Sequence, residues 1–272
     1  MNPRAVTVWV GAVLVVSLAG QDPIYRALAL GAAVAVLVAR HRAGTRLRPA
    51  LLAVAAAASL TVLLNFGLSH TGQDVAVRLP GWIPALGGPL TLEGAIYGVD
   101  IGLGLAACVI AGISLSLVVE AHQLVDALPA WLSRTGAALG AAMSLVPRLG
   151  HSFLAVREAQ QMRGWRPRGL RSWSAVVVPS VLTTIEGSVL LAEAMEARAF
   201  GSGTRTALAS SRWRAADLIV VLTAVVALLG FLASLALGQV ASWQPYPSPG
   251  VPGVNPWPVI CCLALFTPAA LR

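Results

Sequence analysis

The sequence contains no lysine, because all nineteen of its basic residues are arginine. A P-loop needs a lysine to reach the phosphates, so this chain is not itself a P-loop ATPase. Catalysis through a lysine Schiff base is excluded for the same reason. We also find no paired membrane carboxylates and no nucleophile elbow, so we expect a non-catalytic protein with no catalytic residues.

Charge of either sign is also scarce. Charged residues make up 11% of the chain, whereas soluble domains are nearer a quarter charged. With 57% hydrophobic residues and a mean hydropathy of +0.78, the chain carries more apolar surface than a water-soluble fold can bury. The sequence therefore predicts an integral membrane protein. In that class, a net charge of +8 indicates loops held in the cytoplasm rather than nucleic-acid binding.

Metal-ligating side chains are few and scattered. Cys108, Cys261 and Cys262 lie in apolar runs and show neither metal-ligand spacing nor a disulfide framework. His122 and His151 stand alone, which is more typical of surface or capping residues than of metal ligands. We expect no metal site and no cofactor in this chain.

Six apolar stretches approach the roughly 20 residues that a helix needs to cross the hydrocarbon core. The sixth is short and bounded by proline. The predicted spans are Arg4–Asp22, Pro23–Ala39, Pro49–Gln73, Gly94–Val119, Leu218–Leu237 and Pro256–Leu271. The expected fold class is all-α, a polytopic membrane bundle of about six spans with a cytoplasmic helical domain.

The arginines give this bundle a direction. Eleven lie within residues 120–214, four follow the second span and two flank the chain ends. With six spans these seventeen share one side, and only Arg26 and Arg78 do not. The positive-inside rule then places both termini and the central segment in the cytoplasm. The predicted organisation is membrane helices one to four in 1–119, a cytoplasmic domain in 120–214, and helices five and six in 215–272.

The fourth span carries three glycines at intervals of four residues, Gly94, Gly98 and Gly102. This spacing places them on one helix face, where another backbone can approach closely. We expect the ridge to pack against a neighbouring helix, in this chain or in a partner. The same span holds one acid, Asp100, near its outer end. We interpret it as a solvated interfacial residue rather than as a functional membrane carboxylate.

A short pattern occurs twice in the central segment. Residues 158–165 and 193–200 both read Glu-Ala, three variable residues, Arg, a small residue and an aromatic one, and a helix breaker follows each. An arginine in a last helical turn and a small residue after it are typical of ordinary helix ends. Two ordinary ends do not explain why five of eight positions agree in type and order.

A duplicated motif suggests two equivalent contacts, and a partner with two-fold symmetry is the natural receptor. Each guanidinium could grip a carboxylate bidentately, while the small residue lets the backbones approach. The apolar stretch Trp173–Ala192 would separate the two motifs if it crossed the bilayer. Its interior Pro179 and Glu186 argue against a crossing.

The two stretches resemble the paired Ala-Arg-Gly motifs of the T component of energy-coupling-factor (ECF) transporters, the EcfT/CbiQ family. That family includes the cobalt transporter permease CbiQ. Further similarities follow in order along residues 1–210. They comprise Asn2–Arg4, Leu92–Gly98, Gln123–Leu128, Leu145–Arg148, and Ala194–Arg198 with the later Arg205-Thr206 pair.

The resemblance implies a multi-pass subunit of the bacterial plasma membrane that couples two ABC ATPase subunits to a substrate-binding S component. The ATPase subunits bind the ATP, and the transporter takes up a vitamin or a transition metal such as cobalt. Carried over by position, the docking residues are Arg163 and Gly164, Arg198 and Ala199, with Glu158 and Glu196 beside them.

The second motif departs from the family at Ala199, where glycine is usual, and the first at Met162, where alanine is usual. The methyl group of Ala199 is tolerated if its φ is negative and resisted if φ is positive. Two rival interpretations remain. A stand-alone permease needs polar residues along a path through the spans, and a membrane anchor for a soluble complex needs only the docking surface.

Overall fold

The computed structural model describes residues 2–40, 47–69, 72, 74–78, 89–119, 123, 125, 133–167, 169–199, 213–240, 243–246, 250 and 252–271. It is nearly all-α, which confirms the predicted fold class. The chain divides into two compact units. We call residues 1–120 with 211–272 the terminal unit, and residues 121–210 the central unit.

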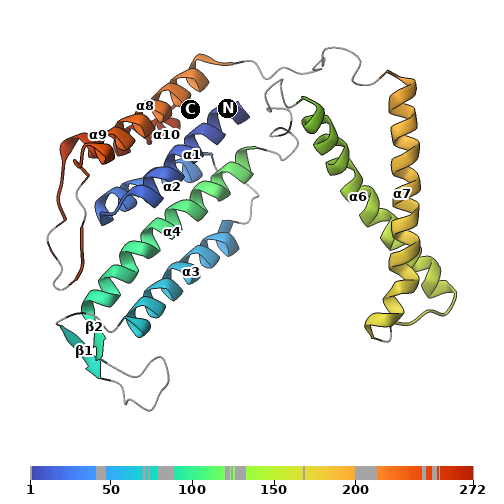
Figure 1. Cartoon of the computed structure of the whole chain (residues 1–272), viewed down its shortest axis with the longest axis horizontal. Coiled ribbons are helices and arrows are strands. Elements are labelled where there is room, and N and C mark those ends of the chain that lie inside the picture. The colour runs from blue at the N-terminus through green and yellow to red at the C-terminus, as the bar shows by residue number, and fades with distance from the viewer. Residues whose placement is uncertain are drawn as a thin grey trace. The chain divides into compact units, whose positions relative to one another are not determined.

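The terminal unit is a bundle whose centre is formed by α1 and α4 (Figure 1). Helix α4 packs against α1, α2 and α3, whereas α1 also packs against α8, and α9 packs against α2 and α8. The helices are α1 (Pro3–Ala19), α2 (Pro23–Arg40), α3 (Leu47–Leu68), α4 (Leu92–Val118), α8 (Ala215–Ala236), α9 (Pro256–Ala264) and α10 (Thr267–Ala270).

The core of this unit combines a few large side chains with many alanines. Trp9, Tyr25 and Phe231 are fully buried, and the Tyr25 and Phe231 rings meet edge to face with centroids 5.8 Å apart. Most of the other buried side chains of α1, α2 and α8 are alanine or valine. Small side chains let helices approach closely, which is how apolar helices associate where the hydrophobic effect is absent.

Proline and a polar cap begin the first two helices. Pro3 and Pro23 stand at the first helical position, where the missing N–H costs nothing. The Asn2 side chain accepts a hydrogen bond from the Arg4 N–H at 3.1 Å, and that of Asp22 accepts one from the Ile24 N–H at 2.9 Å. The starts of α1 and α2 therefore follow from local sequence.

The expected sixth span is not one helix, and the prediction of a continuous helix over 256–271 is wrong. The chain breaks between α9 and α10, because Pro268 has no N–H to donate to the Ala264 carbonyl. The Thr267 hydroxyl donates to that carbonyl instead, at 3.0 Å. The carbonyl of Leu265, freed at the break, accepts from the buried Trp9 Nε1 at 2.8 Å.

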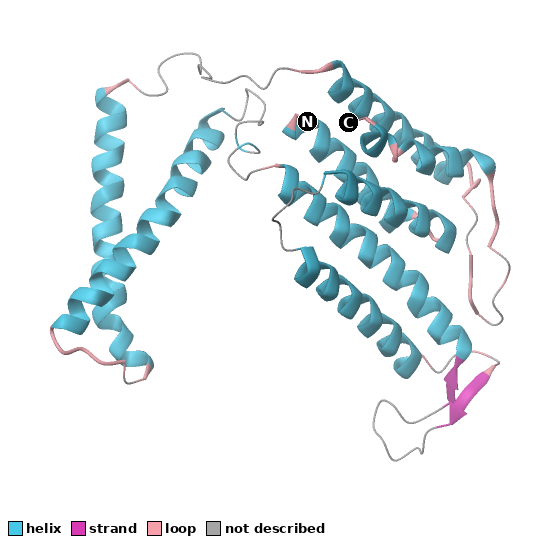
Figure 2. Cartoon of the chain, turned by 180° about the vertical axis from the view of Figure 1, so that it is seen from behind, coloured by secondary structure: helices cyan, strands magenta, loops and turns pink. Residues whose placement is uncertain are grey.

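The segment 69–93 contains an antiparallel hairpin of β1 (Val75–Arg78) and β2 (Pro89–Thr91). The hairpin extends from the end of the bundle where α4 begins (Figure 2). Glu93, in the first turn of α4, accepts from the Asp74 N–H at 3.0 Å and so ties the hairpin to the helix. A second bond, from the Leu92 N–H to the Asp74 carbonyl at 3.0 Å, joins the same two segments.

The central unit, described by itself, is a pair of long helices that cross while running in opposite directions (Figure 1). They are α6 (Ser133–Met162) and α7 (Ser174–Ala197), joined through a short 3-10 turn, η2 (Leu170–Trp173). Each helix continues through an internal proline, Pro147 or Pro179. Their apolar surfaces remain largely exposed, and they border a hollow of about 400 Å³ between Val146, Phe153 and Val181.

Six helices in the described part of the chain are long and apolar enough to cross a membrane, namely α2, α3, α4, α6, α7 and α8. Four coincide with predicted spans. The predicted first span forms α1, a shorter apolar helix of 17 residues. Helices α6 and α7 are also long and apolar enough to cross a membrane. The cytoplasmic location of 120–214 therefore remains a prediction.

Candidate functional site

The first motif ends helix α6 with a left-handed residue. Gly164 has φ of +84°, and its N–H donates to the Gln161 carbonyl at 2.9 Å. The Trp165 N–H reaches back to the Gln160 carbonyl at 2.9 Å. These two bonds form a Schellman motif, in which a left-handed residue after the cap satisfies the last helical carbonyls. Arg163 is the capping residue, and its side chain is exposed.

The second motif also ends helix α7 with a left-handed residue after the arginine. Arg198 is the capping residue, with φ of −92° and ψ of 11°, and its side chain is exposed. The next residue, Ala199, has φ of +52°, and its N–H donates to the Glu196 carbonyl at 2.9 Å. The sign of φ at Ala199 is therefore positive, and its methyl group is attached to a residue in the left-handed conformation, where a side chain is disfavoured.

The two motifs thus share a capping arginine, a left-handed residue after it, and a bond from that residue's N–H to the carbonyl three positions earlier. In each, an exposed arginine caps a long helix and a residue of positive φ follows it. The acids Glu158 and Glu196 are also exposed. Among the described non-glycine residues only Ala199 has a positive φ, and it stands where the first motif has glycine.

The aromatic residue of the first motif is used inside the central unit. The Trp165 indole N–H donates to the Ser172 carbonyl at 2.9 Å, and its ring meets that of Trp173 edge to face at 5.4 Å. Trp173 in turn stacks on Phe153 of α6, with centroids 6.2 Å apart and planes 5° apart. This cluster fixes the chain just after Arg163, a role that sequence analysis missed. The second aromatic, Phe200, lies outside the described residues.

The glycine ridge of α4 faces α3. A side chain at Gly98 would place its Cβ 2.9 Å from the Val62 Cα, and one at Gly102 would lie 3.3 Å from the Ala58 carbonyl oxygen. A Cβ at Gly94 would come within 3.2 Å of the Asn65 carbonyl oxygen. The three positions therefore bring two backbones into direct contact within this chain.

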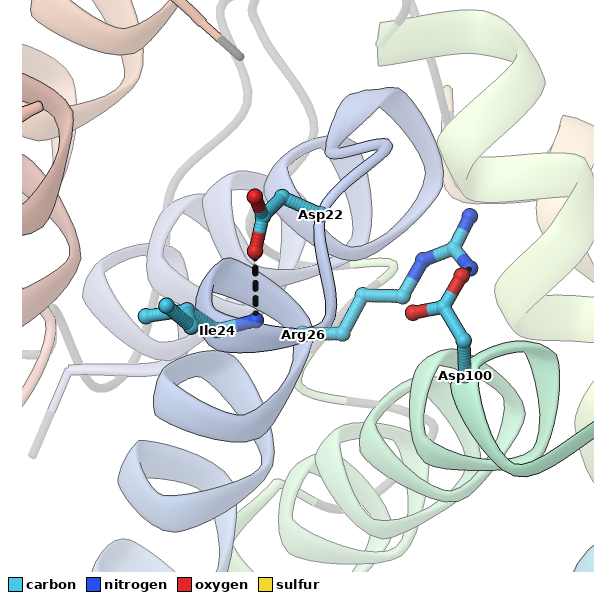
Figure 3. A network of polar contacts seen from close by, with 4 residues as sticks. All are labelled: Asp22, Ile24, Arg26 and Asp100. Carbon is cyan, nitrogen blue, oxygen red and sulfur yellow. Dashed lines mark hydrogen bonds and ion pairs between the residues drawn. The ribbon is translucent and has the colours of Figure 1, made fainter. Parts of the chain in front are cut away.

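A buried ion pair joins α2 to α4. Arg26 reaches across to Asp100, and its Nη1 donates to the Asp100 Oδ2 (Figure 3). The two side chains are 11% and 4% exposed, so the interpretation of Asp100 as a solvated interfacial acid is wrong. The sequence contained a signal for this ion pair. Arg26 and Asp100 are each the single charged residue of their predicted span, and both lie toward the outer end of the predicted bundle.

Glycine makes room for this pair. Gly104 follows Asp100 by one turn, and a Cβ there would lie 3.2 Å from the Arg26 Cδ and 3.3 Å from its Nε. The Arg26 stem therefore lies over the bare backbone of α4 on its way to the carboxylate. A buried charge is tolerated in a low-dielectric setting only when it is paired, and here each charge neutralises the other.

The comparison with known families agrees with this architecture. Residues 1–208 match the family model of CbiQ, described as a cobalt transport protein. The chain belongs to the CbiQ family. No curated protein matches the chain. The match includes α1 to α7, whereas α8, α9 and α10 lie beyond it.

Membership of the CbiQ family confirms the predicted EcfT/CbiQ resemblance and makes the chain a membrane component of a cobalt transport family. Within the described residues no group of three or more His, Cys, Asp or Glu side chains is placed to hold a metal ion. His151 is exposed on α6, and His122 lies outside the described residues.

Proposed function

We propose that this CbiQ-family chain is the coupling subunit of an ECF-type importer. Two ABC ATPase subunits bind and hydrolyse ATP, and each docks on one arginine motif of the central unit. A separate S component binds the vitamin or metal ion, and the membrane helices transmit movement to it. In this proposal the termini and the central unit lie in the cytoplasm of a bacterial cell, and the chain itself catalyses nothing.

The observation that carries the proposal is the geometry that the two motifs share in the described residues, a capping arginine followed by a left-handed residue. An exposed guanidinium on a helix-capping residue is free to grip a carboxylate bidentately, since neither Arg163 nor Arg198 is buried. The left-handed residue that follows turns the chain away and leaves the helix end accessible. Two helix ends with this shared geometry suit two equivalent docking sites, one on each ATPase subunit.

The spacing of the motifs also suits two receptors rather than one. Arg163 precedes α7 and Arg198 caps its far end, so the two lie at opposite ends of a 24-residue helix. At 1.5 Å per residue this helix is about 36 Å long. A single pocket does not span that distance, whereas two sites on a two-fold dimer do.

Co-purification with the ATPase subunits tests the docking role. We expect Arg163→Glu and Arg198→Glu each to weaken binding, and the double variant to abolish both binding and uptake while remaining in the membrane. Arg171→Glu is the matched control, because Arg171 is an exposed arginine of the same unit outside both motifs. Normal binding and uptake by the double variant would exclude paired docking.

Reconstitution separates a coupling subunit from a membrane anchor. Proteoliposomes that contain the chain, the ATPase subunits and the S component should accumulate substrate when ATP is supplied on the ATPase side. An anchor would hold the ATPases in place without making accumulation depend on hydrolysis. Accumulation that continues with a hydrolysis-deficient ATPase would therefore contradict coupling.

Cysteine labelling decides on which side α7 begins and ends. In a background with Cys108, Cys261 and Cys262 replaced by alanine, single cysteines are introduced as Arg166→Cys and Ala197→Cys, both at exposed positions. We expect a membrane-impermeant maleimide to reach both only from the cytoplasm. Labelling from opposite sides would show that α7 crosses the bilayer, and paired docking would then be impossible.

A further inference from the structure

One buried carboxylate holds the beginnings of two helices together. Asp217, in the first turn of α8, is 2% exposed. Its Oδ1 accepts a hydrogen bond from the Asn2 N–H at 3.0 Å, and its Oδ2 accepts one from the Arg214 N–H at 3.2 Å. The starts of α1 and α8 lie at the same end of the terminal unit (Figure 1). We call this arrangement the Asp217 clasp.

The clasp is electrostatically favourable for both helices. A helix N-terminus leaves backbone N–H groups without intrahelical partners and carries a partial positive charge. Asp217 places one carboxylate between two such termini and gives each of them a hydrogen bond. The Asn2 side chain does not compete for this position, because it caps α1 through the Arg4 N–H. The Asn2-Pro3-Arg4 stretch thus begins α1 and joins it to α8.

The clasp lies near one of the two places where the central unit joins the terminal unit. Helix α8 begins at Ala215, a few residues after the central unit ends at Ser210. The central unit also follows α4, which ends at Val118, so displacement of the central unit enters the terminal unit both at the end of α4 and at the start of α8. Helix α8 packs on α1, and α1 packs on α4, the helix that also contacts α2 and α3. The route that enters through α8 therefore passes the clasp and reaches α4 through α1.

We propose that Asp217 is a positioning residue that makes α1 and α8 move as one rigid element, so that displacement of the central unit that arrives through α8 is passed on to α1 and from there to α4. This proposal rests on the coupling function proposed above. It assigns a role to a residue beyond the stretch that matches the CbiQ family, which ends at residue 208.

Distance measurement between the two helices tests the rigid element directly. Spin labels are attached at Val8→Cys and Leu218→Cys, both exposed, in the complete transporter with its other cysteines replaced. Pulsed electron paramagnetic resonance should give one narrow distance that is the same without nucleotide and with ATP. Asp217→Asn should broaden it, because the amide nitrogen cannot accept from Arg214. A distance that changes with nucleotide in the chain with Asp217 intact overturns the proposal.

Transport assays then separate positioning from folding. For Asp217→Asn we expect unchanged ATPase binding, continuing ATP hydrolysis, and uptake lowered by about tenfold, the factor that corresponds to one buried hydrogen bond to a charged group. Thr7→Val is the control, since the exposed Thr7 hydroxyl donates to the Pro3 carbonyl of its own helix. Unchanged uptake, or uptake that falls only as much as ATPase binding falls, overturns the role of Asp217.

The two proposals fail in different ways. If the double Arg163 and Arg198 variant still binds ATPase and transports, the docking function fails, whatever the distance between α1 and α8. If docking holds but the labelled helices separate with ATP, only the clasp fails. The label pair reports on the terminal unit and involves neither docking arginine.

Discussion

Removing either partner of the Arg26–Asp100 pair should destabilise the terminal unit far more than removing both. We consider Arg26→Met, Asp100→Leu and the double variant, because Met and Leu approximate the lost volumes without introducing a polar group. Each single change leaves the opposite charge buried among α2 and α4 without its partner. The double change leaves two apolar side chains in contact.

The magnitude follows from burial. Two unit charges about 4 Å apart attract by about 4 kcal/mol at an effective dielectric constant near 20. Loss of one partner of a buried pair typically costs about 3–5 kcal/mol, since the other charge stays desolvated. With side chains only 11% and 4% exposed, we expect each single variant to lose stability in that range. The double variant should lie within about 1 kcal/mol of the original chain, because apolar replacements of buried pairs are often nearly neutral.

The free energy of unfolding is measured by titrating the protein in mixed micelles with sodium dodecyl sulfate and following helix content by circular dichroism. Arg48→Met, at an exposed position near the start of α3, is the control and should change stability by less than about 0.5 kcal/mol. If the two single losses simply add in the double variant, the residues do not interact and the reasoning is refuted.

Three further changes can be measured on the same chain. Gly98→Ala should lower the free energy of unfolding by about 1–3 kcal/mol, because the new Cβ meets the Val62 backbone. Gly112→Ala has open space around it and should raise the free energy of unfolding by up to about 1 kcal/mol. The same unfolding titration should therefore show changes of opposite sign, and a loss of stability in both variants would contradict the predicted contact. Ala199→Gly should relieve a left-handed alanine and stabilise the end of α7 by about 1 kcal/mol, seen as slower amide exchange there; faster exchange would contradict the strain. Trp173→Ala removes two ring contacts, so tryptic cleavage after the first motif should quicken by about tenfold, and an unchanged rate would mean that the cluster does not hold that segment.

Several parts of the fold follow from local sequence. Apolar runs of sufficient length gave the helices α2, α3, α4 and α8, because length and hydropathy are properties of the run itself. Both motif helices end at their arginine, as a small residue after the cap indicates. The glycine spacing of α4 indicated a close contact, although only the fold shows that α3 provides it.

Other features depend on which helices become neighbours, and a run of residues does not contain that information. The Arg26–Asp100 pair joins residues 74 positions apart, and the Asp217 clasp joins residues 215 positions apart. The conformation of Ala199 left two outcomes open until its φ was known. The apolar run 256–271 does not reveal the break after α9, because the break depends on the backbone N–H that Pro268 lacks.

The short helix α9 has a consequence for the surrounding lipid. Trp257, Ile260 and Leu263 are more than half exposed along a helix of nine residues, which rises about 14 Å. A typical hydrocarbon core is about 30 Å thick. Lipid beside α9 therefore meets an apolar band of roughly half the thickness of the hydrocarbon core, so the bilayer must thin there or another protein must cover this side. Stiff, thick membranes should accommodate this side of the protein less readily than thin ones.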